Sequence, residues 1–202
     1  ADAIGAGSAL FDGTDDYIGC GADSTLNITG NITLSAWIKT SEDDHAIVGK
    51  WDNADGDGYM LYILSGGIVK FNTNNGHRPS TTTVDDGGWH HIAGTWDGTN
   101  GYVYVDGIRE DGSVSGTLAN PLTNSIQVII GAFHSTPRDF FDGNICQVGI
   151  WDAALDQEQI QSIMEKTYEE LTASEKTNLV SYWSLDEQTG TDGEAGTGGV
   201  KD

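Results

Sequence analysis

The chain has 202 residues, among them 28 glycines, 3 prolines and 31 acidic against 9 basic residues, for a formal net charge of -22. Such a charge repels phosphate backbones and anionic lipid headgroups, so nucleic acid and membrane surfaces are excluded as partners. The acidity is solvating charge, an adaptation to salty surroundings, or a set of calcium-binding loops, and composition alone leaves all three open.

The length suits one large β-sandwich better than two domains. Hydrophobic residues make up 37% of the chain, which excludes a disordered polymer, and abundant glycine without a repeat indicates many tight turns. We expect one domain over residues 1–187. Residues 188–202 are glycine-rich and polar, so we expect a loose tail or a linker there.

Alternating apolar and polar residues predict antiparallel strands spaced about ten residues apart. Along residues 32–39 the alternation places four apolar side chains on one face. Hairpins are predicted for residues 59–71, around a Gly66–Gly67 turn, and for residues 89–105. Further strands are expected at 126–131, 145–151 and 180–185.

One segment has helical rather than strand periodicity. Asp156 and Gln159 have the spacing of a capping box, and Ile160 and Ile163 follow at helical intervals. Thr172 and Glu175 form a second such box ahead of a short helical turn. We therefore expect one or two short helices near the C-terminus.

Several segments together resemble laminin-G-like and pentraxin-like jelly rolls of the concanavalin A-like lectin/glucanase superfamily, in the same order along the chain. The segments are ALFDGTDDYI at 9–18, LSAWIK at 34–39, WHHIAGTWDG at 89–98 followed by YVDG at 104–107, FDGNI at 141–145, and YWSLDE at 182–187. The resemblance implies an all-β, antiparallel two-sheet jelly-roll sandwich. It also implies an extracellular, cell-surface or virion-associated protein.

This fold carries lectins, glycosidases, adhesion domains and structural modules, so function has to be argued from sites. Glucanases on this fold place acidic residues at alternate positions of one strand, because retaining chemistry needs two carboxyl groups about 5 Å apart. No strand here has that pattern. Asp43–Asp44 and Asp85–Asp86 are adjacent residues in loop-like segments. We therefore expect a module that is not an enzyme.

Calcium prefers six to eight oxygen ligands, which loops supply best. The resemblance implies a structural Ca2+ ion at the rim of the sandwich, held by acidic residues near the first, late and last strands. The candidate metal ligands are Asp12, Asp16, Asp142, Asn144 and Asp186. A second oxygen-rich loop at 52–58 does not have the order of an EF-hand, and a solvated turn explains it as well.

Sandwich lectins bind sugars through loops that combine Asp and Asn with an aromatic ring. Candidate ligand-binding residues are Asp44, His45, Trp51, Asp57, Asn74, Asn75, His77, Arg78 and Arg138. Trp51 is the candidate for stacking, because the other tryptophans in strand patterns are expected in the core. The two arginines suit a carboxylate or sulfate on an acidic polysaccharide, or are charge partners in an acidic surface.

Cys20 and Cys146 are the only cysteines, and they form either a disulfide or two buried thiols. Alternation places Cys20 with Ile18 and Cys146 with Val148, both on core-facing sides. If the first and late strands are neighbours, a bridge closing about 125 residues stabilises by roughly 4–5 kcal/mol.

The leading hypothesis is a non-catalytic extracellular module that recognises a glycan or polysaccharide, with calcium in support. A structural or protein-interaction module, whose loops face a protein partner, is the alternative. A cryptic glycoside hydrolase comes third, because the acidic pair that it requires is missing.

Overall fold

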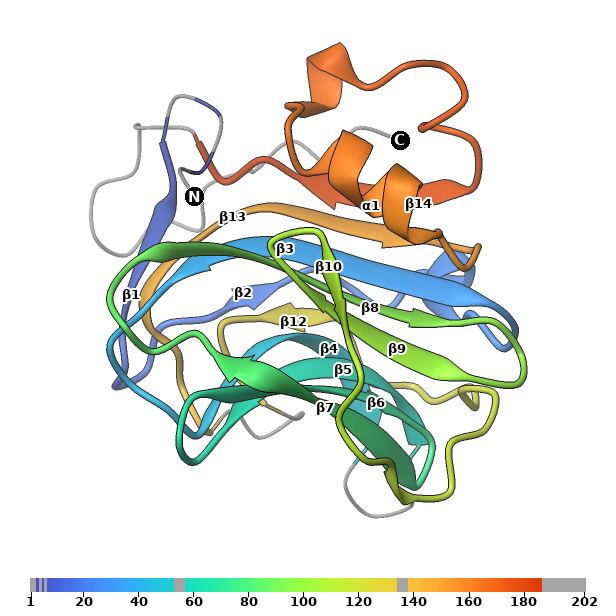
Figure 1. The fold of residues 1–202 in the computed structure, drawn as a ribbon, viewed down its shortest axis with the longest axis horizontal. Coiled ribbons are helices and arrows are strands. Elements are labelled where there is room, and N and C mark those ends of the chain that lie inside the picture. The colour runs from blue at the N-terminus through green and yellow to red at the C-terminus, as the bar shows by residue number, and fades with distance from the viewer. Residues whose placement is uncertain (1–2, 4, 6, 53–56, 134–137, 187–202) are drawn as a thin grey trace.

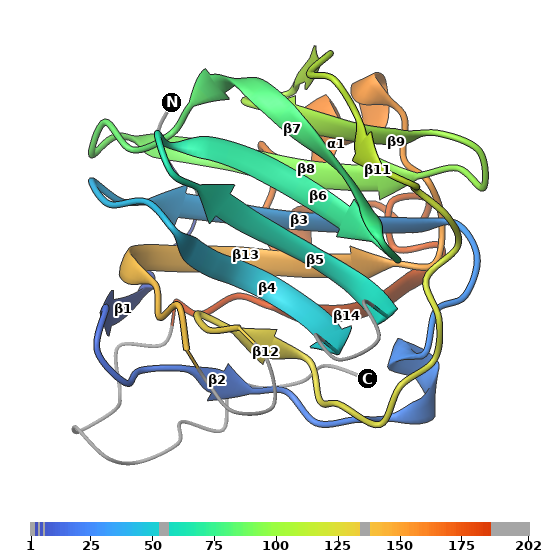
Figure 2. The ribbon, with the colours of Figure 1, turned by 90° about the horizontal axis from the view of Figure 1, so that it is seen from below.

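The computed structural model describes residues 3, 5, 7–52, 57–133 and 138–186. It is a sandwich of two antiparallel sheets, each of seven strands (Figures 1 and 2). This confirms the all-β two-sheet architecture. None of the described helices is long and apolar enough to cross a membrane.

Sheet A joins strands from the beginning, the middle and the end of the chain. Its order is β1 (Ala9–Asp12), β13 (Asp142–Trp151), β3 (Ile32–Lys39), β8 (Trp89–Trp96), β9 (Gly101–Val105) and β10 (Ile108–Glu110), with β14 (Leu179–Trp183) also pairing with β13. Sheet B has the order β11 (Ser115–Gly116), β7 (Gly76–Thr83), β6 (Ile68–Thr73), β5 (Asp57–Leu64), β4 (His45–Asp52), β12 (Ile129–Ile130) and β2 (Ile18–Gly19).

The main core lies between the two sheets and follows the alternation of the sequence. The four apolar residues of β3 that were expected on one face, from Ile32 to Ile38, are all buried in this core. Tyr59, Leu61 and Ile63 of β5 face them from sheet B. Because the side chains of a strand alternate with a period of two, every second residue of these strands faces the main core.

A C-terminal layer covers the outer face of sheet A (Figure 1). It consists of α1 (Gln157–Ile163), the 3-10 helix η2 (Tyr168–Glu170) and the turn that leads into β14. A second apolar cluster joins Ala93, Tyr104 and Trp151 of the sheet to Ile160 and Ile163 of the helix. Asp156 caps α1 with Gln159 in the predicted capping box.

Two indole groups of sheet A anchor this layer. Trp37 Nε1 donates to the carbonyl of Met164 at 3.1 Å, and Trp151 Nε1 donates to the carbonyl of Glu175 at 2.9 Å. Both rings are buried, as are Trp96 and Trp183, which confirms that these tryptophans belong to the core. Each anchor ties a strand of the sheet to the segment that covers it.

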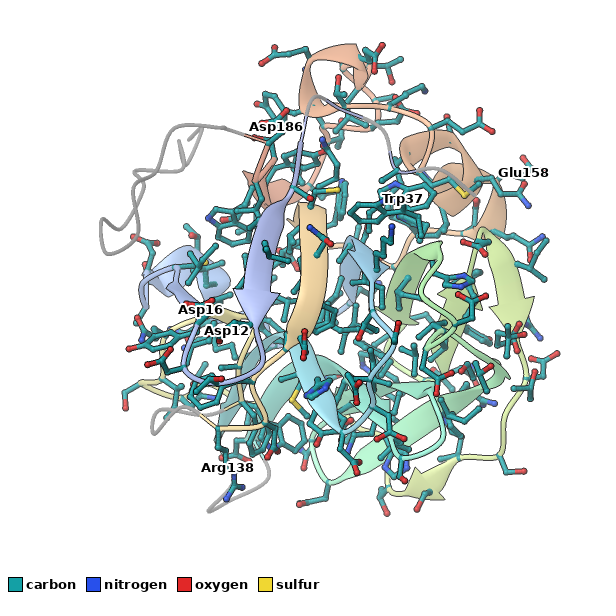
Figure 3. The ribbon with its side chains drawn as sticks, turned by 90° about the vertical axis from the view of Figure 1, so that its left-hand side faces the viewer. Asp12, Asp16, Trp37, Arg138, Glu158 and Asp186 are labelled. Carbon is teal, nitrogen blue, oxygen red and sulfur yellow. The ribbon has the colours of Figure 1, made fainter. Side chains whose placement is uncertain are left out.

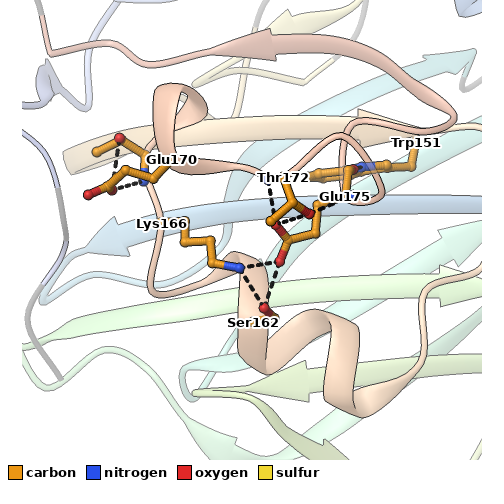
Figure 4. Close-up of polar contacts among 7 residues, drawn as sticks. Trp151, Ser162, Lys166, Glu170, Thr172 and Glu175 are labelled. Atoms are coloured by element: carbon orange, nitrogen blue, oxygen red, sulfur yellow. Dashed lines mark hydrogen bonds and ion pairs between the residues drawn. The ribbon is translucent and has the colours of Figure 1, made fainter.

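Thr172 and Glu175 make the contacts of the second predicted box, although they lie in a turn instead of a helix. Glu175 also accepts hydrogen bonds from Ser162 Oγ at 2.6 Å and from the Lys166 ammonium (Figure 4). Burial alone raises the pKa of Glu175, but the bonds from Lys166, Ser162 and Thr172 outweigh it and lower the pKa to about 2. The ionised carboxylate is therefore a stabilising link inside the C-terminal layer.

We expect Glu175→Gln to lower the free energy of unfolding at pH 7 by about 1–2 kcal/mol, because it removes a charge-assisted bond to Lys166. Since the folded pKa lies below the unfolded value of about 4.3, this contribution is full above pH 5 and disappears as the pH falls toward 2. Urea unfolding at several pH values measures it. The exposed Glu165→Gln is the matched control, and an equal loss at pH 7 and pH 2.5 would contradict the account.

Candidate functional site

The outer face of sheet B carries the candidate site, because no described helix covers it (Figure 2). Along β5, Met60, Tyr62 and Leu64 alternate with the core residues and point to this outer face. They form one apolar cluster with Ala46, Trp51 and Phe133, which is called the sheet-B cluster below. The cluster is a satellite of the main core on the far side of the sheet.

Tyr62 is the centre of this face. Its ring meets that of Phe133 edge to face, with centroids 6.2 Å apart. Its hydroxyl lies 3.0 Å from the carbonyl oxygen of Asp44 and 3.2 Å from Asp139 Oδ2. Burial, followed by the negative charge of Asp139, raises the pKa of Tyr62, so the phenol stays protonated and acts as a donor.

Two cations border the sheet-B cluster. Lys70 Nζ lies 4.6 Å from the centroid of the Tyr62 ring, and the Arg138 guanidinium carbon lies 4.9 Å from that of Phe133. Burial lowers the pKa of Lys70, while Asp139 and Asp44 oppose the shift. The face therefore presents cations over aromatic rings, with carboxylates beside them.

Strand β7 extends this face through His77, which pairs with Asn72 of β6. Burial, and then the charge of Lys70, lowers the pKa of His77. The imidazole is therefore neutral near pH 7, with one donor and one acceptor nitrogen. Asn72 is 7% exposed, and its Oδ1 finds no hydrogen-bond partner within the described part of the chain.

Of the residues predicted to bind ligand, the structure brings Asp44, Trp51, His77 and Arg138 to this face. Trp51 is only 8% exposed and packs inside the sheet-B cluster, so its ring does not present an open surface for stacking. The sequence did not single out Tyr62, Lys70, Asn72 and Asp139. The alternation along β5 was the available signal, because the residues between core positions of a strand must face outward.

The other predicted ligand-binding residues lie elsewhere. His45 meets Phe141 of the main core edge to face, at a centroid distance of 6.1 Å, with both ring nitrogens buried and unpartnered among the described residues. Arg78 follows His77 on the strand and therefore points the opposite way. It donates to the carbonyls of Gly101 and Gly112, which makes it a structural residue at the sheet edge.

Asp57, Asn74 and Asn75 belong to the ends of the strands that form this face. Asp57 starts β5, and its carbonyl accepts from Asn124 Nδ2 at 3.3 Å. Asn74 takes a left-handed conformation with φ 51° in the β6–β7 turn, where Asn75 is exposed. These residues shape the turns at the border of the site.

An acidic rim lies at the end of β1. The carboxylates of Asp12, Asp15 and Asp16 place ligand atoms within 4.8 Å of one another, and all three residues are exposed. Asp142 pairs with Asp12 across β1 and β13, and its carboxylate lies against Gly13, whose left-handed φ of 72° allows the close approach. This group of oxygens has the chemistry to hold a hard cation. Asp15 was missed because it stands between two predicted ligands.

Asp186 lies away from Asp12 and Asp16 (Figure 3), and Asn144 does not join this rim either. Asn144 Nδ2 donates to Ser8 Oγ at 3.1 Å, and the backbone of Asp186 lies against Gly7. Gly7 and Ser8 precede β1, whereas Asp12 ends it. The distance along an extended chain between these points is about 15 Å, so the structure does not bring the five predicted metal ligands together at one place. The loop at 52–58 lies largely outside the described residues.

Of the two states left open for Cys20 and Cys146, the structure has two free thiols and no disulfide between them. Cys20 follows β2 in sheet B and packs against the main core, whereas Cys146 lies in β13 of sheet A. A bulge after Cys146, where Gln147 has φ 52°, shifts the register and separates Cys146 from the core face of Val148. The extra residue of the bulge therefore places Cys146 on the opposite face of the sheet from the one that alternation predicted.

We expect neither thiol to react with a thiol reagent such as DTNB in the native protein at pH 8, because burial raises the pKa of both cysteines to about 12. Two equivalents should react after unfolding in guanidinium chloride. Mass measurement under non-reducing conditions is the control. A mass lower by two hydrogens, or no reactive thiol after unfolding, would contradict the account.

The sequence profile of the family Laminin_G_3, described as "Concanavalin A-like lectin/glucanases superfamily", matches residues 12–161. Among curated proteins, the chain is 29% identical to the rat (Rattus norvegicus) protein "Sushi, von Willebrand factor type A, EGF and pentraxin domain-containing protein 1". That match covers 74% of this chain but only 4% of the relative. The similarity thus concerns one module of a much longer protein.

Similar solved structures include a Bacteroides ovatus protein to which carbohydrate binding has been attributed, with a TM-score of 0.70, 19% identity, and coverage of 92% of this chain and 53% of that one. A heptameric pentraxin from Limulus polyphemus has a TM-score of 0.58 and 18% identity over 77% of this chain and 80% of its own. The CBM40 module of a Ruminococcus gnavus sialidase, bound to α2,3-sialyllactose, has a TM-score of 0.57 and 15% identity over 78% of this chain and 100% of its own. At these identities the similarity shows the fold.

Proposed function

The chain belongs to the concanavalin A-like lectin/glucanases superfamily, and we propose that it is a non-catalytic, extracellular module that binds carbohydrate on the outer face of sheet B. One observation carries this proposal. Aromatic rings, neutral hydrogen-bonding groups and cations meet on the sheet face that no described helix covers. Similar folds that bind sialyllactose in one protein and arabinotriose in another support it.

Sugar recognition needs an apolar surface for the C–H face of the ring and polar groups for its hydroxyls. The sheet-B cluster supplies the first. His77, Asp139 and Asp44 supply donors and acceptors at its border. Lys70 and Arg138 add positive charge, which suits a carboxylate or sulfate on an acidic sugar.

A binding role is favoured over hydrolysis by the distribution of acids. Each described strand contains at most one acidic residue, so no strand there places two carboxylates at alternate positions. Glu110 is the buried acid among them, and its carboxylate is occupied by hydrogen bonds from Thr81 and Thr82. These bonds give Glu110 a structural role.

The acidic rim is proposed as a structural calcium site. Asp12, Asp15 and Asp16 would hold the ion, because their carboxylates lie within 4.8 Å of one another, and Asp142, which pairs with Asp12, would add a fourth. Bound calcium would neutralise charge where four acids meet and would fix the β1 end to β13. Asp186 and Asn144 take no part in this site.

The binding proposal is tested on a glycan array, followed by calorimetry on the tightest hit. We expect His77→Ala and Arg138→Ala each to weaken the affinity by about tenfold, which is the loss of one good hydrogen bond or charged contact. Glu158→Gln on the exposed side of α1 is the control and should bind like the wild type.

If the protein binds no glycan on the array, with or without chelator, the sugar proposal is overturned. Crosslinked oligomers of the parent protein without sugar affinity would instead favour a structural or protein-interaction module. Equal binding by the two variants and the wild type would place the sugar site elsewhere on the molecule.

For calcium, we expect about 1 mM CaCl2 to raise the unfolding temperature of the chelator-treated protein by several degrees, because an ion that binds only the folded state stabilises it. Asp15→Asn should abolish most of this rise, since Asp15 offers a carboxylate to the rim. Magnesium at the same concentration controls for general screening. An unchanged calcium response in the variant would refute the site.

A further inference from the structure

A cavity of about 530 Å3 lies on the other side of the molecule, where the C-terminal layer ends over sheet A. Thr95, Tyr102 and Tyr104 of β8 and β9 line it together with Arg109 and Asp111. The segment that enters α1 forms the opposite wall. The volume is within the range of small-ligand sites. This site is separate from the outer face of sheet B.

The cavity combines aromatic rings with excess negative charge. Asp97, Asp111 and Asp156 line it, against the single cation Arg109, so the charged groups of the lining sum to two negative charges. Arg78 has its guanidinium carbon 5.9 Å from the Tyr102 ring, but it does not line the cavity, and two of its nitrogens donate to backbone carbonyls. An anionic ligand is therefore disfavoured.

Local bonds hold two of these carboxylates in place. Asp97 Oδ1 accepts from the backbone amides of Thr99 and Asn100 at 2.8 and 2.7 Å, which fixes the β8–β9 turn. Asp156 Oδ1 accepts from the Gln159 amide at 2.9 Å as the cap of α1. Their positions at the cavity are thus determined before any ligand arrives, which limits the ordering cost of binding.

The chain itself shows which chemistry suits this cavity. The Arg109 guanidinium lies 4.7 Å from the Tyr102 ring and forms an ion pair with Asp111 at 3.1 Å. An organic cation is therefore already held between a tyrosine face and a carboxylate at one side of the cavity. Asp97 and Asp156 are exposed and add two further carboxylates to the same lining, where Tyr102 is the partly exposed aromatic ring and Tyr104 is buried at 4% exposure.

We propose that this cavity binds an organic ammonium group on a small polar ligand, with an amino sugar as the form that its hydroxyl and amide groups suit best. The Tyr102 hydroxyl and the Gln157 amide serve the polar part of such a ligand, and Leu155 contacts its apolar edge. The proposal goes beyond carbohydrate binding on sheet B, since it concerns another face of the molecule and a positively charged ligand, whereas the cations on sheet B suit a negatively charged one.

The test uses the full chain and a glucosamine tetramer, compared with the N-acetylated tetramer that keeps the sugar but loses the charge. Binding is measured by calorimetry and located by amide shifts of Thr95, Tyr102 and Leu155 in NMR spectra. The double variant Asp97→Asn/Asp156→Asn removes both charges, while asparagine still serves the turn and the helix cap. The charge-matched control is Glu42→Gln/Glu165→Gln, at two exposed positions away from the cavity.

We expect the amine tetramer to bind with shifts at the cavity, and the acetylated tetramer and the Asp97→Asn/Asp156→Asn variant each to lose about tenfold in affinity. The control variant should stay within about twofold, because distant surface charges are screened. Spermidine and trilysine are tested in parallel to identify the molecule that carries the ammonium group. If either one binds and loses affinity in the Asp97→Asn/Asp156→Asn variant, the result supports the ammonium site with a ligand other than an amino sugar.

Equal affinity for the acetylated tetramer would overturn the proposal in favour of a neutral-sugar site. Equal losses in the cavity variant and the control would overturn it as general attraction to an acidic protein. Failure of all three amine ligands to bind would overturn it as well. The amide shifts at Thr95, Tyr102 and Leu155 separate binding at the cavity from binding on sheet B, so affinities are compared only for ligands that shift these residues.

Discussion

The attachment of the C-terminal layer to sheet A determines where this protein can bind a ligand. A two-sheet sandwich has four sheet faces, and the two inner ones bury each other in the main core. The outer face of sheet A is occupied by α1 and the segment up to β14, anchored by the indole bonds of Trp37 and Trp151. Only the outer face of sheet B is left without a covering helix among the described elements.

The distribution of positive charge fits this arrangement. Lys50 is buried at 1% exposure, and its ammonium is bound by Asn124 Oδ1 and by the carbonyls of Asn124 and Ile126. Burial lowers the pKa of Lys50, and the hydrogen bonds to these oxygens offset the free-energy cost of burying its charge. Lys166 forms an ion pair with Glu175. Lys70 and Arg138, in contrast, stand beside the aromatic rings of the open face, where a ligand can reach them.

Much of the fold could be predicted because alternation and turn chemistry are local. The β8–β9 hairpin, the buried face of β3 and the cap of α1 all follow from residues close together in the chain. Strand β7 was missed, because Gly76–Thr83 contains Pro79 and no apolar alternation. It tolerates the proline at a register shift against β6, beside the short edge strand β11.

The site was harder to predict than the fold, because it depends on which face of the sheet each side chain of a strand points to. His77 and Arg78 were both candidates, but neighbours on a strand point to opposite faces, and only His77 reaches the open face. The bulge at Gln147 changed the face of Cys146 in the same way. Tyr62 became visible as a site residue only once the pairing of β4, β5 and β6 showed what surrounds it.

Chemical-shift mapping of a bound glycan that carries no amino group tests the central claim most directly. With the amides of the chain assigned, the claim predicts that shifts concentrate on the outward-facing residues of β4 to β7, around Tyr62, Lys70 and His77. Shifts confined to the acidic rim at residues 12–16, or to the C-terminal layer over sheet A, would contradict it.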